Sequence, residues 1–170
     1  MERPPNFNMN LRYEKTDVLR GLLIYAAGDT TAALLLRQFS VSRWLGLMAV
    51  GATLYAFEIP NYFCWINRRT QNAGRWRGAL KRTLLALLYF NPLWIARHLF
   101  FIKFFSAAWG EISWQLLSIA GWSFLVNIPI SLTANFIIQN VLSLRWRFLA
   151  SALFSALMAV YYALSEAFFR

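Results

Sequence analysis

The sequence predicts an all-α protein, a polytopic transmembrane helix bundle of four to five spans with proline-kinked helices. Of its 170 residues, 59% are hydrophobic and only 14% are charged, and the mean hydropathy is +0.44. Soluble domains have a lower apolar and a higher charged share. The charges gather in short segments between long apolar runs, and three of these runs contain a proline beside a polar residue.

We expect two regions, a polar amino-terminal segment over residues 1–16 and a single transmembrane helical domain over residues 17–170. A helix needs about 20 apolar residues to cross a bilayer. The runs that meet this length are Asp17 to Leu36, Trp44 to Ile66, Thr83 to Ala107, Ile112 to Gln139 and Arg147 to Phe169.

Individual runs have their own features. Small residues four positions apart, such as Ala26 and Thr30 in the first run, allow close helix approach. Prolines in the second and third runs predict kinks, because each removes a backbone hydrogen bond. The fourth run is long and is interrupted at Asn127 and Pro129, so it is either one tilted helix or a pair of half-helices.

Basic residues between the second and third runs predict a loop over about 67–82. By the positive-inside rule, this loop and the amino terminus face the cytoplasmic or matrix-like side. Basic residues mixed with aromatic ones are also typical of nucleic-acid contacts. The net charge of +10 is explained by the inner loops of a membrane protein, so the expected partners are anionic lipids and not nucleic acid. The expected head-group ligands are Arg68, Arg69, Arg75, Arg77, Lys81 and Arg82.

Several polar residues lie inside the apolar runs, where a charge at a helix centre costs roughly 2.5 to 3.5 kcal/mol. They should therefore face the bundle interior. At about 1.5 Å per residue, Asp29 and Arg97 come to similar depth, which predicts an ion pair or a shared polar cavity. Such a pair either lines a pathway or only locks two helices together. The candidate pathway residues are Asp29, Glu58, Asn91, Arg97, His98, Asn127 and Asn135.

Catalytic and metal-binding signals are weak. One cysteine, Cys64, and one histidine, His98, do not suffice for a metal cluster or an internal disulfide, so we expect no metal and no cofactor. The sequence has no nucleophile elbow, no zinc-binding His-Glu helix and no phosphate-binding glycine loop. We therefore expect that the protein is not an enzyme, and that His98 is an interior hydrogen-bonding group.

Several short motifs follow one another along the chain. They are Gly28-Asp29, Pro60 with Trp65 five residues later, Phe90-Asn91-Pro92, and Pro129 followed by Asn135-Phe136. With these motifs the chain resembles, over almost its whole length, the peroxisomal membrane protein twenty-two/Mpv-seventeen family. It departs from the family pattern where polar residues or tryptophan are replaced, at Ala33, Ala86-Leu87, Ile128 and Leu132.

The resemblance implies a small integral protein of an organelle membrane that forms a channel for small solutes. The mitochondrial inner membrane is favoured, with the peroxisomal and the bacterial inner membrane as alternatives. The lost polar positions favour a second function, a non-catalytic accessory or structural subunit docked in a larger membrane complex. For that function the aromatic stretch over 99–105 is the expected docking surface for other membrane subunits.

Overall fold

The computed structural model describes residues 11–168, with the backbone alone at 159 and 162–168. The polar segment predicted over 1–16 lies mostly outside the described residues, as does the last residue of the fifth apolar run. The described residues contain helices and no strand, so the predicted all-α class is confirmed. In chain order the elements are α1 (Lys15–Leu35), α2 (Val41–Val50), the π-helical turn η1 (Gly51–Tyr55), α3 (Ala56–Thr70), α4 (Arg75–Tyr89), α5 (Pro92–Phe105), the 3-10 turn η2 (Trp109–Glu111), α6 (Gln115–Asn140) and α7 (Leu144–Phe168).

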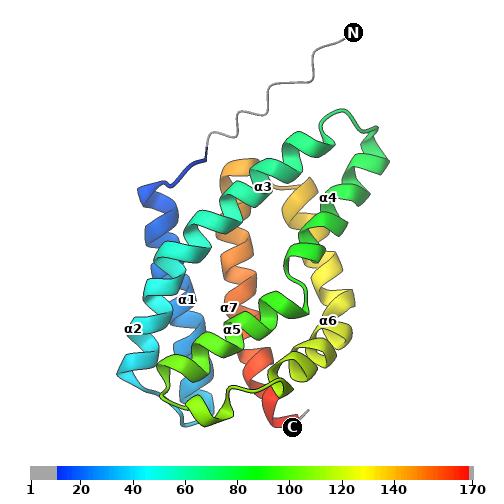
Figure 1. The fold of residues 1–170 in the computed structure, drawn as a ribbon. Helices are drawn as coiled ribbons and strands as arrows, with labels where there is room; N and C mark the ends of the chain where they lie inside the picture. Colours follow the sequence, from blue (N-terminus) through cyan, green and yellow to red (C-terminus); the bar gives the residue numbers. More distant parts are fainter. Residues whose placement is uncertain (1–10, 169–170) are drawn as a thin grey trace.

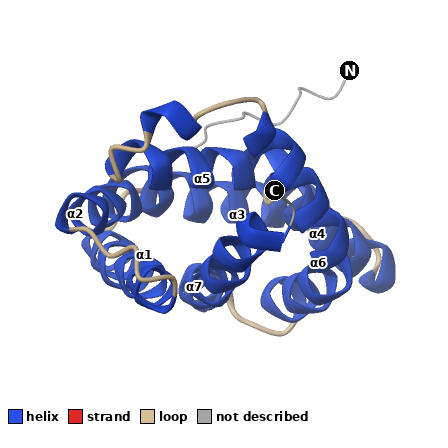
Figure 2. Ribbon diagram, turned by 90° about the horizontal axis from the view of Figure 1, so that it is seen from below, coloured by secondary structure: helices blue, strands red, loops and turns tan. Residues whose placement is uncertain are grey.

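The helices form a bundle in which the chain runs repeatedly between two ends (Figure 1). The start of α1, the turn between α3 and α4 and the turn between α6 and α7 lie at one end. Seen from below, α1 and α2 occupy one side and α4 and α6 the other, with α7 between α1 and α6 (Figure 2). Helix α5 runs obliquely from the end of α4 and contacts both α2 and α6.

Polar side chains determine where two of the helices begin. Ser40 caps α2, because its Oγ accepts a hydrogen bond from the Arg43 backbone N–H at 3.1 Å. Asn91 caps α5 in the same way through the Trp94 backbone N–H, also at 3.1 Å. Pro92 takes the first position of α5, where the missing N–H costs no hydrogen bond. The predicted third run, Thr83 to Ala107, is therefore divided between two helices, α4 and α5, at Phe90 and Asn91.

The fourth apolar run gives one helix, so the half-helix alternative is wrong. Helix α6 is continuous from Gln115 to Asn140 with Pro129 inside it. Helix α3 likewise contains Pro60 without interruption, and the π-helical turn η1 directly precedes it. The stretch from α2 to α3 is thus continuous helix from Val41 to Thr70.

Helix α1 packs closely against two neighbours at its glycines. Gly21 faces Gly51 of η1, and a Cβ on either residue would overlap the backbone carbonyl of the other. Gly28 faces α7, where a Cβ would lie 2.6 Å from the Cα of Ala156. Real Cβ atoms do not approach so closely, so both contacts require glycine.

Three stretches among the described residues are long and apolar enough to cross a membrane. They are α1, the stretch Arg75–Phe105 that joins α4 and α5, and α6. The predicted loop over 67–82 is shorter than expected. Helix α3 continues to Thr70 and α4 begins at Arg75, so the basic residues of this region lie on α3 and α4 and not in a loop.

Candidate functional site

A buried ion pair joins α1 to α2 in the interior of the bundle. The Nε and Nη2 of Arg43 donate hydrogen bonds to the two carboxylate oxygens of Asp29, at 2.8 and 2.5 Å. The exposed fractions are 2% for Asp29 and 3% for Arg43, so neither charge reaches solvent. Two parallel bonds between a guanidinium and a carboxylate fix the relative geometry of the helices that carry them.

A second ion pair joins α3 to α5. Both terminal nitrogens of Arg97 donate to the carboxylate of Glu58, at 3.0 and 2.7 Å, and the Tyr89 hydroxyl of α4 donates to the same carboxylate at 2.8 Å. The guanidinium lies 5.6 Å from the ring centroid of Tyr55. This pair is half-buried and draws three helices and η1 together.

The predicted ion pair between Asp29 and Arg97 is therefore wrong, since each residue has another partner. The depth count measured the position of Arg97 along the third apolar run at a constant rise per residue. The run breaks at Asn91, and the oblique α5 brings Arg97 beside Glu58. Arg43 lies in the first turn of α2, after a short connection from α1, and reaches back to Asp29.

Aromatic side chains surround His98 between these two ion pairs. His98 is buried, and its Nδ1 lies 3.1 Å from the Tyr55 hydroxyl oxygen. Its ring stacks on Trp94 with the centroids 5.7 Å apart and the planes within 5°. Tyr55 also packs on Tyr25 of α1, at 4.6 Å between centroids. His98 is thus an interior hydrogen-bonding group held by its neighbours.

A line of buried polar residues runs along α6. They follow one another at every fourth position and continue on the facing helix α7. We call this set the polar seam, and it comprises Ser123, Asn127, Ser131, Asn135 and Gln139 of α6 with Arg147 and Ser151 of α7. Residues four apart form the ridges by which helices pack. At about 1.5 Å per residue, the α6 part of the seam extends over roughly 24 Å.

The polar seam is only partly hydrogen-bonded. Asn127 donates through Nδ2 to the Ser131 hydroxyl at 2.8 Å, and Arg147 donates to the Gln139 side-chain oxygen at 3.4 Å. Among the described residues, no partner is present for the Ser123 hydroxyl, for Oδ1 of Asn127 or for Nε2 of Gln139. Buried polar groups are normally hydrogen-bonded. These three groups thus lack the hydrogen bonds that buried polar groups normally make.

Other predicted pathway and motif residues lie apart from the polar seam. Asn91 is a helix cap, as described above. Phe90 packs edge-on against Trp94, and Trp65 stacks on Tyr62. Pro129 and Phe136 are exposed on the outer side of α6. The sequence reasoning found Asn127 and Asn135 but missed Ser123, Ser131, Gln139 and Arg43. The four-residue spacing of polar residues along α6 was the signal for three of them.

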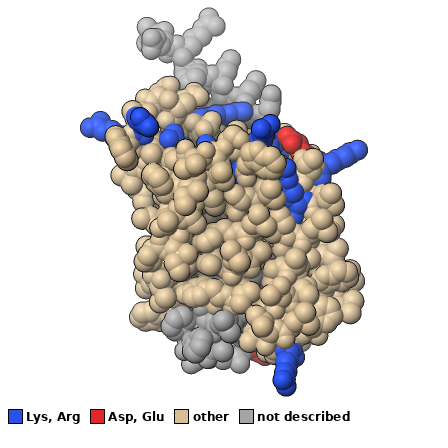
Figure 3. All heavy atoms as spheres, turned by 180° about the vertical axis from the view of Figure 1, so that it is seen from behind, with Lys and Arg blue, Asp and Glu red and all other residues tan. Residues whose placement is uncertain are grey.

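Basic side chains gather at one end of the molecule. In Figure 3 the Lys and Arg side chains cluster at the end where α3 and α4 meet, and a broad belt without exposed charge lies below them. The predicted head-group ligands belong to this end. All of them are exposed except Arg82, which is half-buried because its Nε donates to the Asn140 side chain at 2.8 Å.

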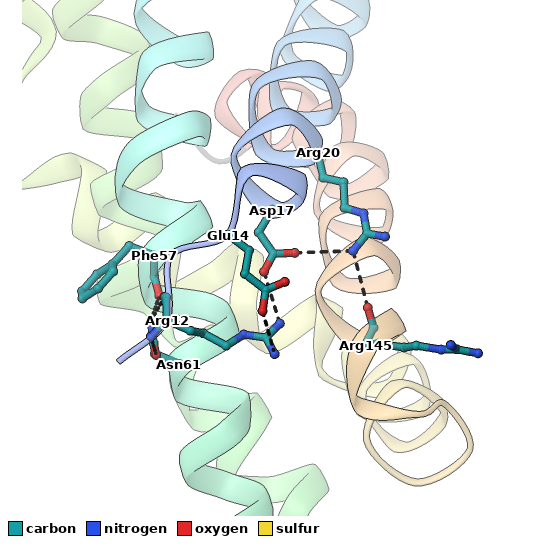
Figure 4. Close-up of polar contacts among 7 residues, drawn as sticks. All are labelled: Arg12, Glu14, Asp17, Arg20, Phe57, Asn61 and Arg145. Atoms are coloured by element: carbon teal, nitrogen blue, oxygen red, sulfur yellow. Dashed lines mark hydrogen bonds and ion pairs between the residues drawn. The ribbon is translucent and has the colours of Figure 1, made fainter. Parts of the chain in front are cut away.

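The segment before α1 is bound to this same end by polar contacts (Figure 4). The side-chain amide of Asn61 pairs with the backbone of Arg12, accepting from its N–H at 3.0 Å and donating to its C=O at 2.8 Å. The buried carboxylate of Asp17 accepts from Arg12 at 3.2 Å and from Arg20 at 3.4 Å. These contacts connect the segment before α1 to α3.

These features define the class of the protein: an all-helical bundle with helices suited to a membrane and with polar groups inside. No protein-family model, curated protein or solved structure matches the chain. The resemblance to the peroxisomal membrane protein twenty-two/Mpv-seventeen family stays a prediction.

Proposed function

We propose that the chain is an integral membrane protein with five spans, namely α1, the continuous stretch from α2 to α3, α4 with α5, α6 and α7. The uncharged belt below a basic end supports this topology (Figure 3). The positive-inside rule then assigns the basic end to the cytoplasmic or matrix-like side. Among membranes, the family resemblance favours the mitochondrial inner membrane.

Within that membrane we propose that the protein passes small polar solutes along the polar seam. The observation that carries the proposal is the set of unpartnered buried polar groups between α6 and α7. An unsatisfied polar group in a membrane interior costs several kcal/mol, so water or solute there is favoured. The seam extends over roughly 24 Å, close to the hydrocarbon thickness of about 30 Å.

The charged residues act as a frame for this path. The carboxylates of Asp29 and Glu58 each accept paired hydrogen bonds from an arginine of another helix. These carboxylates could bind a charged solute only after their ion pairs with arginine had broken. The solutes that fit the seam are therefore uncharged molecules able to exchange hydrogen bonds with hydroxyl and amide groups.

The accessory-subunit function has less support. Its expected docking surface was the aromatic stretch over 99–105, but the Phe105 ring packs where a Cβ of Gly46 would lie, and Leu99 is buried. Among the phenylalanines of this stretch, Phe104 alone is exposed. Most of the expected docking surface is thus buried or packed against the core of the bundle.

Flux through liposomes tests the proposal. The purified protein is reconstituted, and the uptake of water, urea and glycerol is followed by light scattering after mixing with each solute. We expect Asn127→Leu, which removes polar groups from the seam, to reduce flux to the level of empty liposomes. Thr133→Val is the matched control, because Thr133 lies on the exposed side of the same helix. Wild-type flux from a folded Asn127→Leu protein would refute the path, and stoichiometric co-purification of other subunits without flux would favour the accessory function.

A further inference from the structure

An open groove lies between α4 and α6 on the outside of the bundle. Its volume is about 560 Å³, within the range of about 300 to 1,000 Å³ that ligand sites occupy. Its lining includes Leu80 of α4 and Leu132 and Phe136 of α6, all of them exposed. The groove therefore presents an almost wholly apolar wall to whatever lies outside the protein.

The one charged residue of this lining is Arg77, in the first turn of α4. Its side chain is exposed, and its neighbour in the groove, Trp76, is 79% exposed. Both belong to the basic end of the molecule, where membrane head groups would lie. Tryptophan is enriched at this level of a bilayer because its ring is amphipathic. An apolar groove that ends at a cation and a tryptophan matches an anionic lipid in shape and charge.

We propose that this groove binds one anionic glycerophospholipid, with an acyl chain against Leu80, Leu132 and Phe136 and the phosphate beside Arg77. The proposal rests on the membrane location proposed above and is independent of permeation. It goes beyond a diffuse attraction of lipids to the basic end, because it assigns one cation and one apolar groove to a single molecule.

Charge argues for this occupant over a second copy of the chain. Arg77 lines the groove, and Arg75 and Lys81 are exposed on the same helix. A symmetric contact between two copies would bring these cations together, and like charges at an interface cost several kcal/mol. A phosphate beside Arg77 instead places an opposite charge among these cations.

Hydrogen bonds hold the floor of the groove in place. Nδ2 of Asn140 on α6 donates to the Thr83 hydroxyl of α4 at 3.1 Å, and Arg82 donates to Oδ1 of Asn140. Thr83 itself lines the groove. The distance between α4 and α6 is thus set before a lipid arrives, so little ordering cost is added on binding.

Fluorescence quenching of Trp76 by lipids with brominated acyl chains tests the proposal. Delipidated protein in a neutral detergent is titrated with brominated phosphatidylglycerol or with brominated phosphatidylcholine. The signal of Trp76 is obtained by subtracting the titration of a Trp76→Phe variant. We expect phosphatidylglycerol to quench Trp76 at a concentration about fivefold lower than phosphatidylcholine needs, the preference that one basic residue gives near an anionic lipid.

Three variants separate the groove from the basic end as a whole. Arg77→Gln should abolish the fivefold preference, and Thr133→Phe, which fills the groove, should abolish quenching by both lipids. Arg69→Gln removes an equal charge from an exposed position outside the groove lining, and should leave the preference intact. Equal effects of Arg77→Gln and Arg69→Gln, unaltered quenching in Thr133→Phe, or a dimer that excludes the lipid would each overturn the proposal.

Solute flux of the same variants keeps the two proposals apart. Arg77→Gln should keep wild-type flux while it loses the lipid preference. If the wild type shows the lipid preference, Arg77→Gln loses it and neither protein shows flux, the lipid site stands and permeation is refuted. If the wild type shows flux but no lipid preference, permeation stands and the lipid site is refuted.

Discussion

Removing the charge of Asp29 should strongly destabilise the bundle, because it breaks a buried ion pair. Asp29→Asn leaves the guanidinium of Arg43 without its carboxylate, at a position that is 3% exposed. Removing one partner of a buried ion pair costs about 3 to 5 kcal/mol, because an unpaired charge stays buried. Arg43→Met should cost a similar amount by leaving the carboxylate unpaired.

The combined variant distinguishes an ion pair from two unrelated polar residues. Asp29→Leu with Arg43→Met removes both charges and fills the space with apolar atoms, which for buried pairs is often neutral or stabilising. We expect this double variant to exceed each single variant in stability by at least about 2 kcal/mol. The assay is the free energy of unfolding in mixed micelles, followed by tryptophan fluorescence as sodium dodecyl sulfate is added.

A parallel cycle tests the pairing that the sequence alone suggested. Asp29→Asn and Arg97→Leu remove charges that belong to different ion pairs, so their effects should add to within about 0.5 kcal/mol. Additive effects of the Asp29 and Arg43 variants, or strong coupling between Asp29 and Arg97, would refute the arrangement described here.

Two further predictions concern helix contacts. Gly28→Ala should lower the melting temperature, because its Cβ would lie 2.6 Å from the Cα of Ala156. The control Gly121→Ala meets no atom within 4 Å and should raise the melting temperature slightly. Equal shifts of the two variants in a thermal scan would contradict the α1–α7 contact. Asn61→Ala should release the segment before α1 and speed deuterium exchange of the Arg12 amide about tenfold or more, since two hydrogen bonds are lost. Exchange as slow as in an Asn72→Ala control would show that other contacts hold this segment.

The helical nature of the chain could be predicted because it depends on local properties. Long apolar runs between charged segments indicate helices whatever their packing, and α1 and α6 match the first and fourth runs closely. The helix break at Asn91-Pro92 could also have been predicted from the sequence. Asn before Pro is a typical helix start, although the apolar residues on both sides suggested one long helix.

Partners across the bundle could not be predicted in the same way. Depth along an axis brings Asp29 and Arg97 to the same level, but contact also requires the right tilt and rotation of each helix. The oblique direction of α5 decides that Arg97 meets Glu58, and no local pattern in the sequence encodes that direction. The second predicted run begins at Trp44 and leaves out Arg43, although Ser40, three residues before Arg43, is a capping residue.

The π-helical turn η1 is the part of the long helix from Val41 to Thr70 that can best tolerate the deletion of one residue. A π turn is closed by hydrogen bonds from residue i to i+5, as between Gly51 and Ala56, and so contains about one residue more than an α turn. Deleting one residue between Gly51 and Tyr55 would turn it into an α turn and leave both flanking halves facing as they do now. Elsewhere in the helix, the same deletion would rotate everything beyond it by about 100°. A deletion within this helix therefore keeps both the Asp29–Arg43 and the Glu58–Arg97 pair where it falls at this turn.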